Sequence, residues 1–328
     1  MKYLLFKEEF KDGIYELFFD FQKEEKFFKE LSREEFERIL FLNPEFKKEG
    51  TFVCLDNDKI VGVISSLIRS TDIDNPNASG YIHTFIVKKE YRRQGIGSKL
   101  LELVEEYFKN NGKASSRVVF LGCINYPWII PHTNHLHPGC PGVRINSEYY
   151  LFLYHHGYFV NSIHEGFHLN LCDYQLPDKV AKKIENAKEH GIDIELYDPN
   201  KHFGVEEFCE VIDNPGFANA IRNNLKRDEP RPFVIASDHG KMVAWTGAIY
   251  VEESGRGHLD GICVSPLARK GGLGTGIFSK LCIELKQRGA EYMTFFTGLD
   301  NPARYIYLGA GFNVAQSFAD MKKVFNKE

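Results

Sequence analysis

Two segments of the chain place an arginine, a glycine turn and a helix in an order that could hold an anion. Residues 87–98 read VKKEYRRQGIGS, and residues 264–275 read VSPLARKGGLGT. Each segment follows an apolar, strand-like run and precedes a stretch with helical periodicity. Glycines let the backbone turn tightly, and the free N–H groups of a first helical turn favour a negative charge. Both segments therefore predict a phosphate-binding turn at the start of a helix.

Neither turn belongs to the two commonest classes of nucleotide-binding loop. A Walker A loop needs Gly-Lys-Ser/Thr after its first glycine, and neither copy has it. The dinucleotide fingerprint needs a third glycine, where this chain has Leu100 or Ile277. We therefore expect the anion to be a pyrophosphate outside the ATPase and dehydrogenase classes.

The two turns belong to a repeat that spans most of the chain. A hairpin pattern precedes each turn, and a helix, a strand, a short aromatic helix and a Gly-aromatic pair follow it. The sequence thus predicts an α/β (α+β) domain that occurs twice, with domains at 1–174 and 175–328. The first copy is longer than the second, which indicates an insert near 123–147.

Composition excludes several classes of function. The chain has 328 residues, 43% hydrophobic, with 41 Lys and Arg against 45 Asp and Glu, so neither disorder nor nucleic-acid binding is expected. The start lacks the long apolar region of a signal peptide, and no segment is apolar enough for a membrane span. The seven cysteines form no CxxC pair, so we expect a cytoplasmic protein with reduced thiols. The oligomeric state does not follow from the sequence.

The second turn and its flanks resemble a known family. The pattern Val264-x-Pro-x-x-Arg269-x-x-Gly272-x-Gly274 is similar to the acyl-CoA motif of the GNAT superfamily of N-acetyltransferases, and residues 300–312 resemble its companion motif. The layout of two copies is similar to tandem GNAT proteins. The resemblance implies two GNAT-like domains, each with a mixed, mostly antiparallel sheet flanked by helices. It also implies acetyl-CoA as cosubstrate and a small amine as acceptor.

The same resemblance assigns residues to acetyl-CoA. Backbone amides of the turn would hold the pyrophosphate, and the end of the preceding strand would bind the pantetheine arm. In the second copy these residues are Ile262, Cys263, Val264, Arg269, Lys270, Gly271, Gly272, Leu273, Gly274 and Thr275, with Asn301 and Ala303 from the companion motif. In the first copy they are Phe85, Ile86, Val87, Arg92, Arg93, Gln94, Gly95, Ile96, Gly97 and Ser98.

Three residues of the second copy are candidates for proton transfer. Tyr307 matches the family's tyrosine, whose hydroxyl can donate a proton to the leaving thiolate. Asp260 lies four residues before Val264, where family members often carry a carboxylate that acts as the general base. His258, on the same strand face, is the alternative candidate for the general base.

The first copy departs from the family at both catalytic positions. Leu153 stands where the second copy has Tyr307, with Tyr154 one residue out of register, and His83 stands at the position of Asp260. We therefore expect the first copy to bind CoA or to be vestigial, and the second copy to be catalytic.

Two further interpretations remain open at this point. Both copies could bind acyl-CoA without catalysis, as a sensor or scaffold. The histidine-rich run 132–140 could bind zinc, but its spacing is irregular, so we expect no metal and a loop that lines a pocket or covers the sheet.

Overall fold

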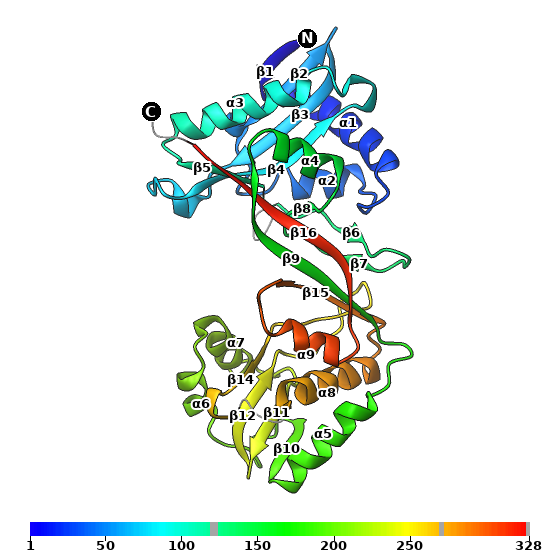
Figure 1. Ribbon diagram of the computed structural model, residues 1–328, viewed down its shortest axis with the longest axis vertical. Helices are drawn as coiled ribbons and strands as arrows, with labels where there is room; N and C mark the ends of the chain where they lie inside the picture. Colours follow the sequence, from blue (N-terminus) through cyan, green and yellow to red (C-terminus); the bar gives the residue numbers. More distant parts are fainter. Residues whose placement is uncertain (119–123, 269–271, 326–328) are drawn as a thin grey trace. The chain divides into compact units, whose positions relative to one another are not determined.

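The computed structural model describes residues 1–118, 124–268 and 272–325. Contacts between residues divide the chain into two compact units (Figure 1). Unit 1 comprises Met1–Glu165 and Gln316–Glu328, and unit 2 comprises Gly166–Ala315. Residues 166–174 thus belong with unit 2 and the C-terminal strand with unit 1, while the domains 1–174 and 175–328 stay a prediction.

Unit 1 is a mixed sheet with helices on both faces. Its strands follow the order β1-β2-β3-β4-β5-β16-β9. From β1 to β16 the neighbouring strands are antiparallel, except for the parallel pair β4 and β5. The strands are β1 (Lys2–Leu5), β2 (Thr51–Asp56), β3 (Lys59–Leu67), β4 (Ser79–Val87), β5 (Ser115–Val118), β9 (Phe159–Asn170) and β16 (Asn313–Val324), with short β6 (Trp128–Ile129), β7 (Leu136–His137) and β8 (Val143–Arg144). The helices are α1 (Lys11–Glu24), α2 (Arg33–Ile39), α3 (Ile96–Asn110) and α4 (Glu148–His155).

The core of unit 1 follows the period-two alternation of its strands. Val53, Val63 and Tyr81 face the side covered by α1 and α2. Their chain neighbours Cys54, Ile64 and Ile82 face the side covered by α3 and α4. The predicted helical stripe of α3, from Ile96 to Phe108, is fully buried on this second side.

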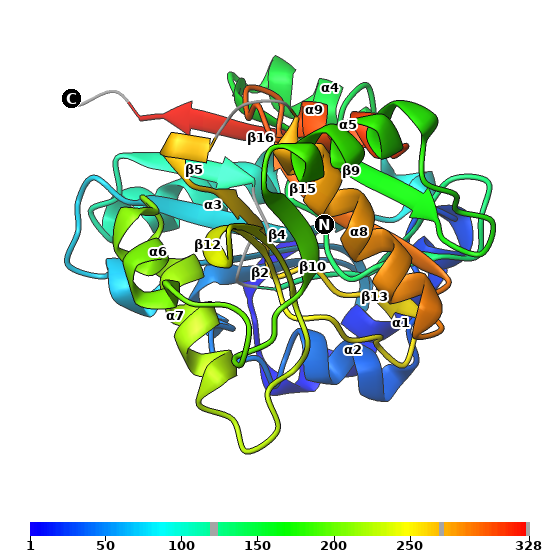
Figure 2. The same cartoon turned by 90° about the horizontal axis from the view of Figure 1, so that it is seen from below.

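Unit 2 repeats this plan with shorter strands. The antiparallel sheet β10-β11-β12-β14 has α8 on one face and α6 and α7 on the other, and β15 pairs in parallel with β13 (Figures 1 and 2). The strands are β10 (Ile192–Leu196), β11 (Val234–Asp238), β12 (Lys241–Thr246), β13 (Arg256–Gly257), β14 (Ile262–Val264) and β15 (Tyr292–Gly298). The helices are α5 (Asp178–Glu189), α6 (Val205–Val211), α7 (Pro215–Leu225), α8 (Leu273–Gln287) and α9 (Arg304–Gly309). The fold class predicted from the sequence is confirmed.

One predicted strand is shorter than its pattern indicated. The apolar run 258–264 is regular only over β14, because Gly261 has a φ of 149° and interrupts the extended backbone. His258 and Asp260 therefore lie in an irregular segment just before the strand. None of the helices within the described ranges combines the length and apolarity that crossing a bilayer requires.

Candidate active site

Unit 2 contains a cavity of about 480 Å³ where β14 begins and β15 ends. Its walls come from the α6–α7 connection, the segment before β14, the end of β15 and the start of α9. The lining residues are Asp213, Asn214, Phe217, Leu259, Asp260, Gly261, Ile262, Cys263, Phe295, Phe296, Thr297, Asn301, Ala303 and Tyr307. The cavity thus brings together Asp260 and Tyr307, the two residues that the sequence puts forward for proton transfer.

Two glycines allow the Asp260 backbone to adopt its position. A Cβ atom at Gly247 would lie 2.4 Å from the Cβ of Asp260, closer than real Cβ atoms come. A Cβ atom at Gly261 would lie 2.3 Å from the Phe217 ring, and the φ of Gly261 disfavours any L side chain. Asp260 then accepts a hydrogen bond at Oδ2 from the backbone N–H of Ala248, at 3.1 Å.

Asp260 is the last member of a row of four charged side chains. His258 lies between two carboxylates, with its Nε2 2.8 Å from Asp260 Oδ1 and its Nδ1 2.9 Å from Glu252 Oε1. Arg256 binds Glu252 in a bidentate way, at 2.8 and 2.5 Å. The sequence analysis missed Glu252 and Arg256, since nothing in their spacing indicates that they approach Asp260.

This arrangement shifts the pKa values of its members in opposite directions. Burial lowers the pKa of His258, but the bonds to Asp260 and Glu252 raise it by more, so it lies above its ordinary 6.5. The bond from His258 lowers the pKa of Asp260 against the opposing effect of burial. For Glu252, the bonds from Arg256 and His258 outweigh burial and lower the pKa. The arrangement therefore favours the protonated form of His258 between the two carboxylates.

Tyr307 lies on the other side of the cavity, within an aromatic cluster. Its ring packs edge-on against Phe295 at 4.5 Å between centroids and also contacts Phe278 and Phe167. Burial raises the pKa of Tyr307 to about 12. Within the described residues the hydroxyl has no hydrogen-bond partner, so it is available to a bound molecule.

The glycine turn of unit 2 begins helix α8 as predicted. Gly272 is the N-cap residue, with a φ of 79°. Leu273, Gly274 and Thr275 follow it and form the first turn of the helix. Lys183 of α5 lies beside this turn, because a Cβ atom at Gly272 would be 2.9 Å from its Nζ. Lys183 was not among the residues predicted from the sequence. Arg269, Lys270 and Gly271 lie outside the described residues.

The remaining predicted residues of unit 2 flank the cavity and the turn. Ile262, Cys263 and Val264 form β14 and pair with β12 in antiparallel register. Asn301 and Ala303 begin the turn into α9, where the Ala303 N–H donates to Asn301 Oδ1 at 2.9 Å. Gly274 lies against α9, with Ile306 Cδ1 2.8 Å from the position of a Cβ atom.

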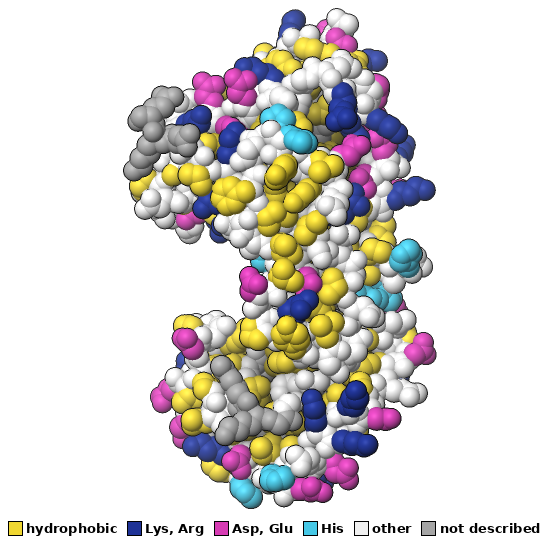
Figure 3. All heavy atoms as spheres, viewed as in Figure 1, with side chains coloured by type: hydrophobic (Ala, Val, Ile, Leu, Met, Phe, Trp, Pro, Cys, Tyr) yellow, Lys and Arg dark blue, Asp and Glu magenta, His cyan; other side chains and the backbone are white. Residues whose placement is uncertain are grey.

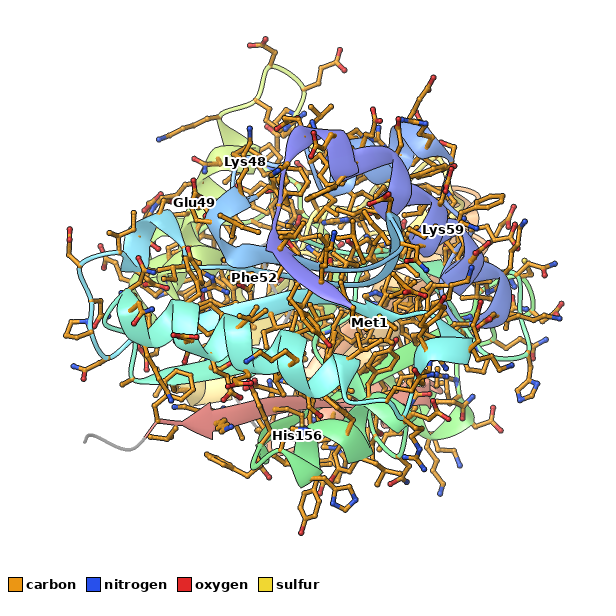
Figure 4. All side chains as sticks on the ribbon, turned by 90° about the horizontal axis from the view of Figure 1, so that it is seen from above. Met1, Lys48, Glu49, Phe52, Lys59 and His156 are labelled. Atoms are coloured by element: carbon orange, nitrogen blue, oxygen red, sulfur yellow. The ribbon has the colours of Figure 1, made fainter. Side chains whose placement is uncertain are left out.

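In unit 1 the corresponding turn also begins a helix. Gly95 caps α3 with a φ of 80°, and Arg92 donates through Nε to the carbonyl of Val87 at 3.0 Å. His156, at the end of α4, lies 2.8 Å from Ser98 Oγ at the start of α3 (Figure 4). Phe85 and Ile86 belong to the end of β4, which leads to this turn, and Ile96 and Gly97 are the first residues of α3. Within the turn, the Gln94 side chain donates to the carbonyl of Glu90, and Arg93 has a φ of 63°.

Unit 1 also has a cavity at the end of β4, but its chemistry differs. It measures about 110 Å³ and is lined mainly by aromatic and aliphatic side chains, including Leu153. His83 is buried there, and burial lowers its pKa to about 3, so it is neutral. Tyr154 is 60% exposed, and Tyr149, one helical turn before Leu153, lines the cavity instead. The sequence analysis missed Tyr149.

The histidine-rich insert takes part in this cavity and in a ring stack. Cys140, Gly142 and Val143 line the cavity. His137 stacks on Trp128 at 5.4 Å between centroids, and its Nδ1 accepts from the Gly139 N–H. Among the residues described, no three His, Cys, Asp or Glu side chains are grouped so as to hold a metal ion.

Exposed apolar side chains gather over α4 and the start of β9, among them Leu151, Tyr154 and Phe159 (Figure 3).

Comparison with known proteins gives matches in both units. The model of the acetyltransferase (GNAT) family matches residues 12–126 and 196–312. N-alpha-acetyltransferase 30 of Schizosaccharomyces pombe is 39% identical over 70 residues, which are 21% of this chain and 42% of that protein. The chain thus spans less than half of the length of this curated relative.

Solved structures share the fold over nearly the whole chain. A GCN5-related N-acetyltransferase from Sphaerobacter thermophilus has a TM-score of 0.60 at 15% identity, covering 98% of this chain and 95% of that one. A tandem GNAT protein from the clavulanic acid biosynthesis pathway has a TM-score of 0.57 at 12% identity, covering 100% and 99%. The glucosamine N-acetyltransferase region of a fungal multi-domain β-N-acetylglucosaminidase has a TM-score of 0.66 at 16% identity, covering 98% and 38%.

Proposed function

Because the chain belongs to the acetyltransferase (GNAT) family, we propose that unit 2 transfers the acetyl group of acetyl-CoA directly to a small amine. The observation that carries this proposal is the cavity that Asp260 and Tyr307 share. One residue can take a proton from the amine and the other can give a proton to the leaving sulfur. General acid–base catalysis depends on side chains positioned to take or give protons in this way.

The first turn of α8 would hold the pyrophosphate of acetyl-CoA. Its backbone N–H groups and the positive end of the helix dipole favour an anion, and the Lys183 ammonium adds a charge beside Gly272. Ile262 to Val264 lie at the end of the strand that leads to the turn, and Asn301 and Ala303 at the start of α9. The pantetheine arm would run between these segments to the cavity.

The proposed transfer conserves protons and electrons. An N–H bond of the acceptor ammonium breaks, and its proton passes to the Asp260–His258 pair. The freed electron pair forms the C–N bond to the acetyl carbon, and the C–S bond breaks with its electrons on sulfur. The nitrogen then carries a positive charge and loses a second proton to solvent, which leaves the neutral amide. The Tyr307 hydroxyl donates a proton to that sulfur, and solvent then restores both residues. The products are an amide and free thiol.

The raised pKa of Tyr307 suits the role of donor. A hydroxyl with a pKa of about 12 keeps its proton throughout the physiological range, so it can meet the thiolate in every turnover. A tyrosinate with such a high pKa regains its proton from solvent after the transfer.

For unit 1 we propose binding of acyl-CoA without transfer. Its α3 turn carries the same glycines, with Phe85 to Val87 leading to it. At the catalytic positions, however, it has the neutral His83 and the aliphatic Leu153, neither of which can do the work of Asp260 or Tyr307. This part of the proposal keeps the sensor or scaffold interpretation for one unit only.

The experiment measures acetyl-CoA turnover with a panel of small amines, and the release of free thiol is the readout. We expect at least one amine to give release above the amine-free rate, with an acetylated product detected by mass spectrometry. Binding of acetyl-CoA by calorimetry, without turnover for any amine, would favour the non-catalytic module for both units.

A further inference from the structure

We propose that Glu252 and Arg256 are positioning residues that fix His258 against Asp260, so that the four side chains form one proton-accepting relay. The inference rests on the proposed function, because it assigns a role to residues behind the same cavity. Only Asp260 of the four lines the cavity, and it would therefore meet the acceptor amine.

The relay is anchored at its far end. Arg256 Nη1 donates to the backbone carbonyl of Thr294 in β15, at 3.0 Å, while its other nitrogens hold both oxygens of Glu252. The Arg256 side chain is only 12% exposed, so this anchor is shielded from water. Arg256 therefore holds the Glu252 carboxylate in place, and neither Glu252 nor Arg256 lines the cavity.

The His258 ring is also fixed through its face. It stacks on Tyr250 with 4.2 Å between centroids and an angle of 21°, and the Arg231 guanidinium lies 3.8 Å from the centroid of Tyr250. The backbone N–H of His258 donates to the backbone carbonyl of Tyr250 at 3.1 Å. The charged groups around the imidazole are therefore Asp260 and Glu252 at its edges, with Arg256 and Arg231 behind them.

Both ring nitrogens face a carboxylate, and this determines how the relay takes a proton. The protonated ring donates from both nitrogens and satisfies both carboxylates. When the ring is neutral, one nitrogen turns a lone pair toward a carboxylate oxygen, which is unfavourable. The neutral state therefore accepts a proton readily, and the proton that Asp260 receives from the amine is transferred to His258 Nε2.

Without Glu252 the relay would lose one of these two anions. His258 would keep only the bond to Asp260, its affinity for a proton would fall, and its ring could rotate. A charge at hydrogen-bond distance ordinarily moves a pKa by about 1–3. We therefore expect the Glu252→Gln variant, which keeps an acceptor oxygen for Nδ1–H, to lower the pKa of His258 by about one pH unit.

The test compares Glu252→Gln with Glu253→Gln, in which the adjacent exposed glutamate loses the same charge. The His258 Cε1 proton is titrated by NMR, and the rate of amine acetylation is measured across pH 5.5–9.5. We expect both the NMR midpoint and the acidic limb of kcat/KM to move down by about one pH unit in Glu252→Gln, with a maximal rate reduced about tenfold. Glu253→Gln should match the wild type.

Two results would overturn the relay. One is a midpoint and an acidic limb that are unchanged in Glu252→Gln, and the other is an equal shift in both variants. The NMR titration does not depend on turnover, so it tests the relay even if no amine is acetylated. A wild-type protein that is inactive toward every amine would contradict the proposed function and not the relay.

Discussion

His258 Nε2 lies 2.8 Å from Asp260 Oδ1, although the residues between β13 and β14 form no regular strand. Gly261, with its φ of 149°, ends this segment and turns the chain into β14. The bond from His258 lowers the pKa of Asp260, and the bonds to Asp260 and Glu252 raise the pKa of His258 against the effect of burial.

The position of Asp260 should depend on Gly247. An alanine there would place a methyl group 2.4 Å from the Asp260 Cβ, which must then move. We expect Gly247→Ala to lower kcat by at least tenfold and to destabilise unit 2 by about 1–3 kcal/mol, as overpacking does. Gly298→Ala is the matched control, since a Cβ atom there has no neighbour within 4 Å. Unchanged kinetics in Gly247→Ala would show that Asp260 need not be held in place.

Removal of the Tyr307 hydroxyl should slow transfer but not binding. Loss of a positioned acid costs about 10²–10⁴ in rate, so Tyr307→Phe should lower kcat by a factor in that range. Acetyl-CoA affinity by calorimetry should be nearly unchanged, because the ring still fills its aromatic cluster. Tyr154→Phe, on the exposed side of α4, should behave as the wild type. If Tyr154→Phe were inactive and Tyr307→Phe active, catalysis would belong to unit 1.

Lys183 should contribute to CoA binding. Its Nζ lies beside the first turn of α8, so Lys183→Ala should weaken CoA binding about tenfold and reduce its salt dependence. Lys182→Ala removes an exposed lysine from the same helix and serves as the control. Equal affinity in both variants would remove Lys183 from the site.

The pH dependence of the wild type follows from the sign of the His258 shift. The pKa of His258 is raised above 6.5, and the relay accepts a proton only when this group is deprotonated. The rate of acetylation should therefore rise with pH through a midpoint above 6.5, and Tyr307 should add no second limb below about pH 12. A rate that falls with pH between 6.5 and 8.5 would contradict this assignment.

Local patterns in the sequence were sufficient for the elements and for part of the site. The stripe of α3 and the cap at Gly272 are encoded by residues close together in the chain, so they could be predicted. Tyr307 and Asp260 followed from a motif with fixed spacing. Both now line one cavity, although their catalytic roles stay predictions.

The rest depends on contacts between distant segments. Lys183 reaches Gly272 only because α5 packs beside α8, and Arg256 reaches Thr294 only because β13 pairs with β15. The placement of the C-terminal strand is of the same kind, since Met321 pairs with Val118 across most of the chain length. Neither spacing nor propensity carries such information.

The most direct test of the account places one glutamate in each glycine turn. Gly274 and Gly97 occupy the same position in α8 and α3. A Cβ atom would lie 2.8 Å from Ile306 of α9 at Gly274 and 3.3 Å from Phe152 of α4 at Gly97, and a glutamate at either position would repel a pyrophosphate. Amine-dependent thiol release is measured for both variants after circular dichroism confirms folding. If unit 2 is the transferase, Gly274→Glu lowers kcat/KM for acetyl-CoA by at least a hundredfold, and Gly97→Glu stays within about twofold of the wild type. Loss of activity in Gly97→Glu alone would contradict the central claim.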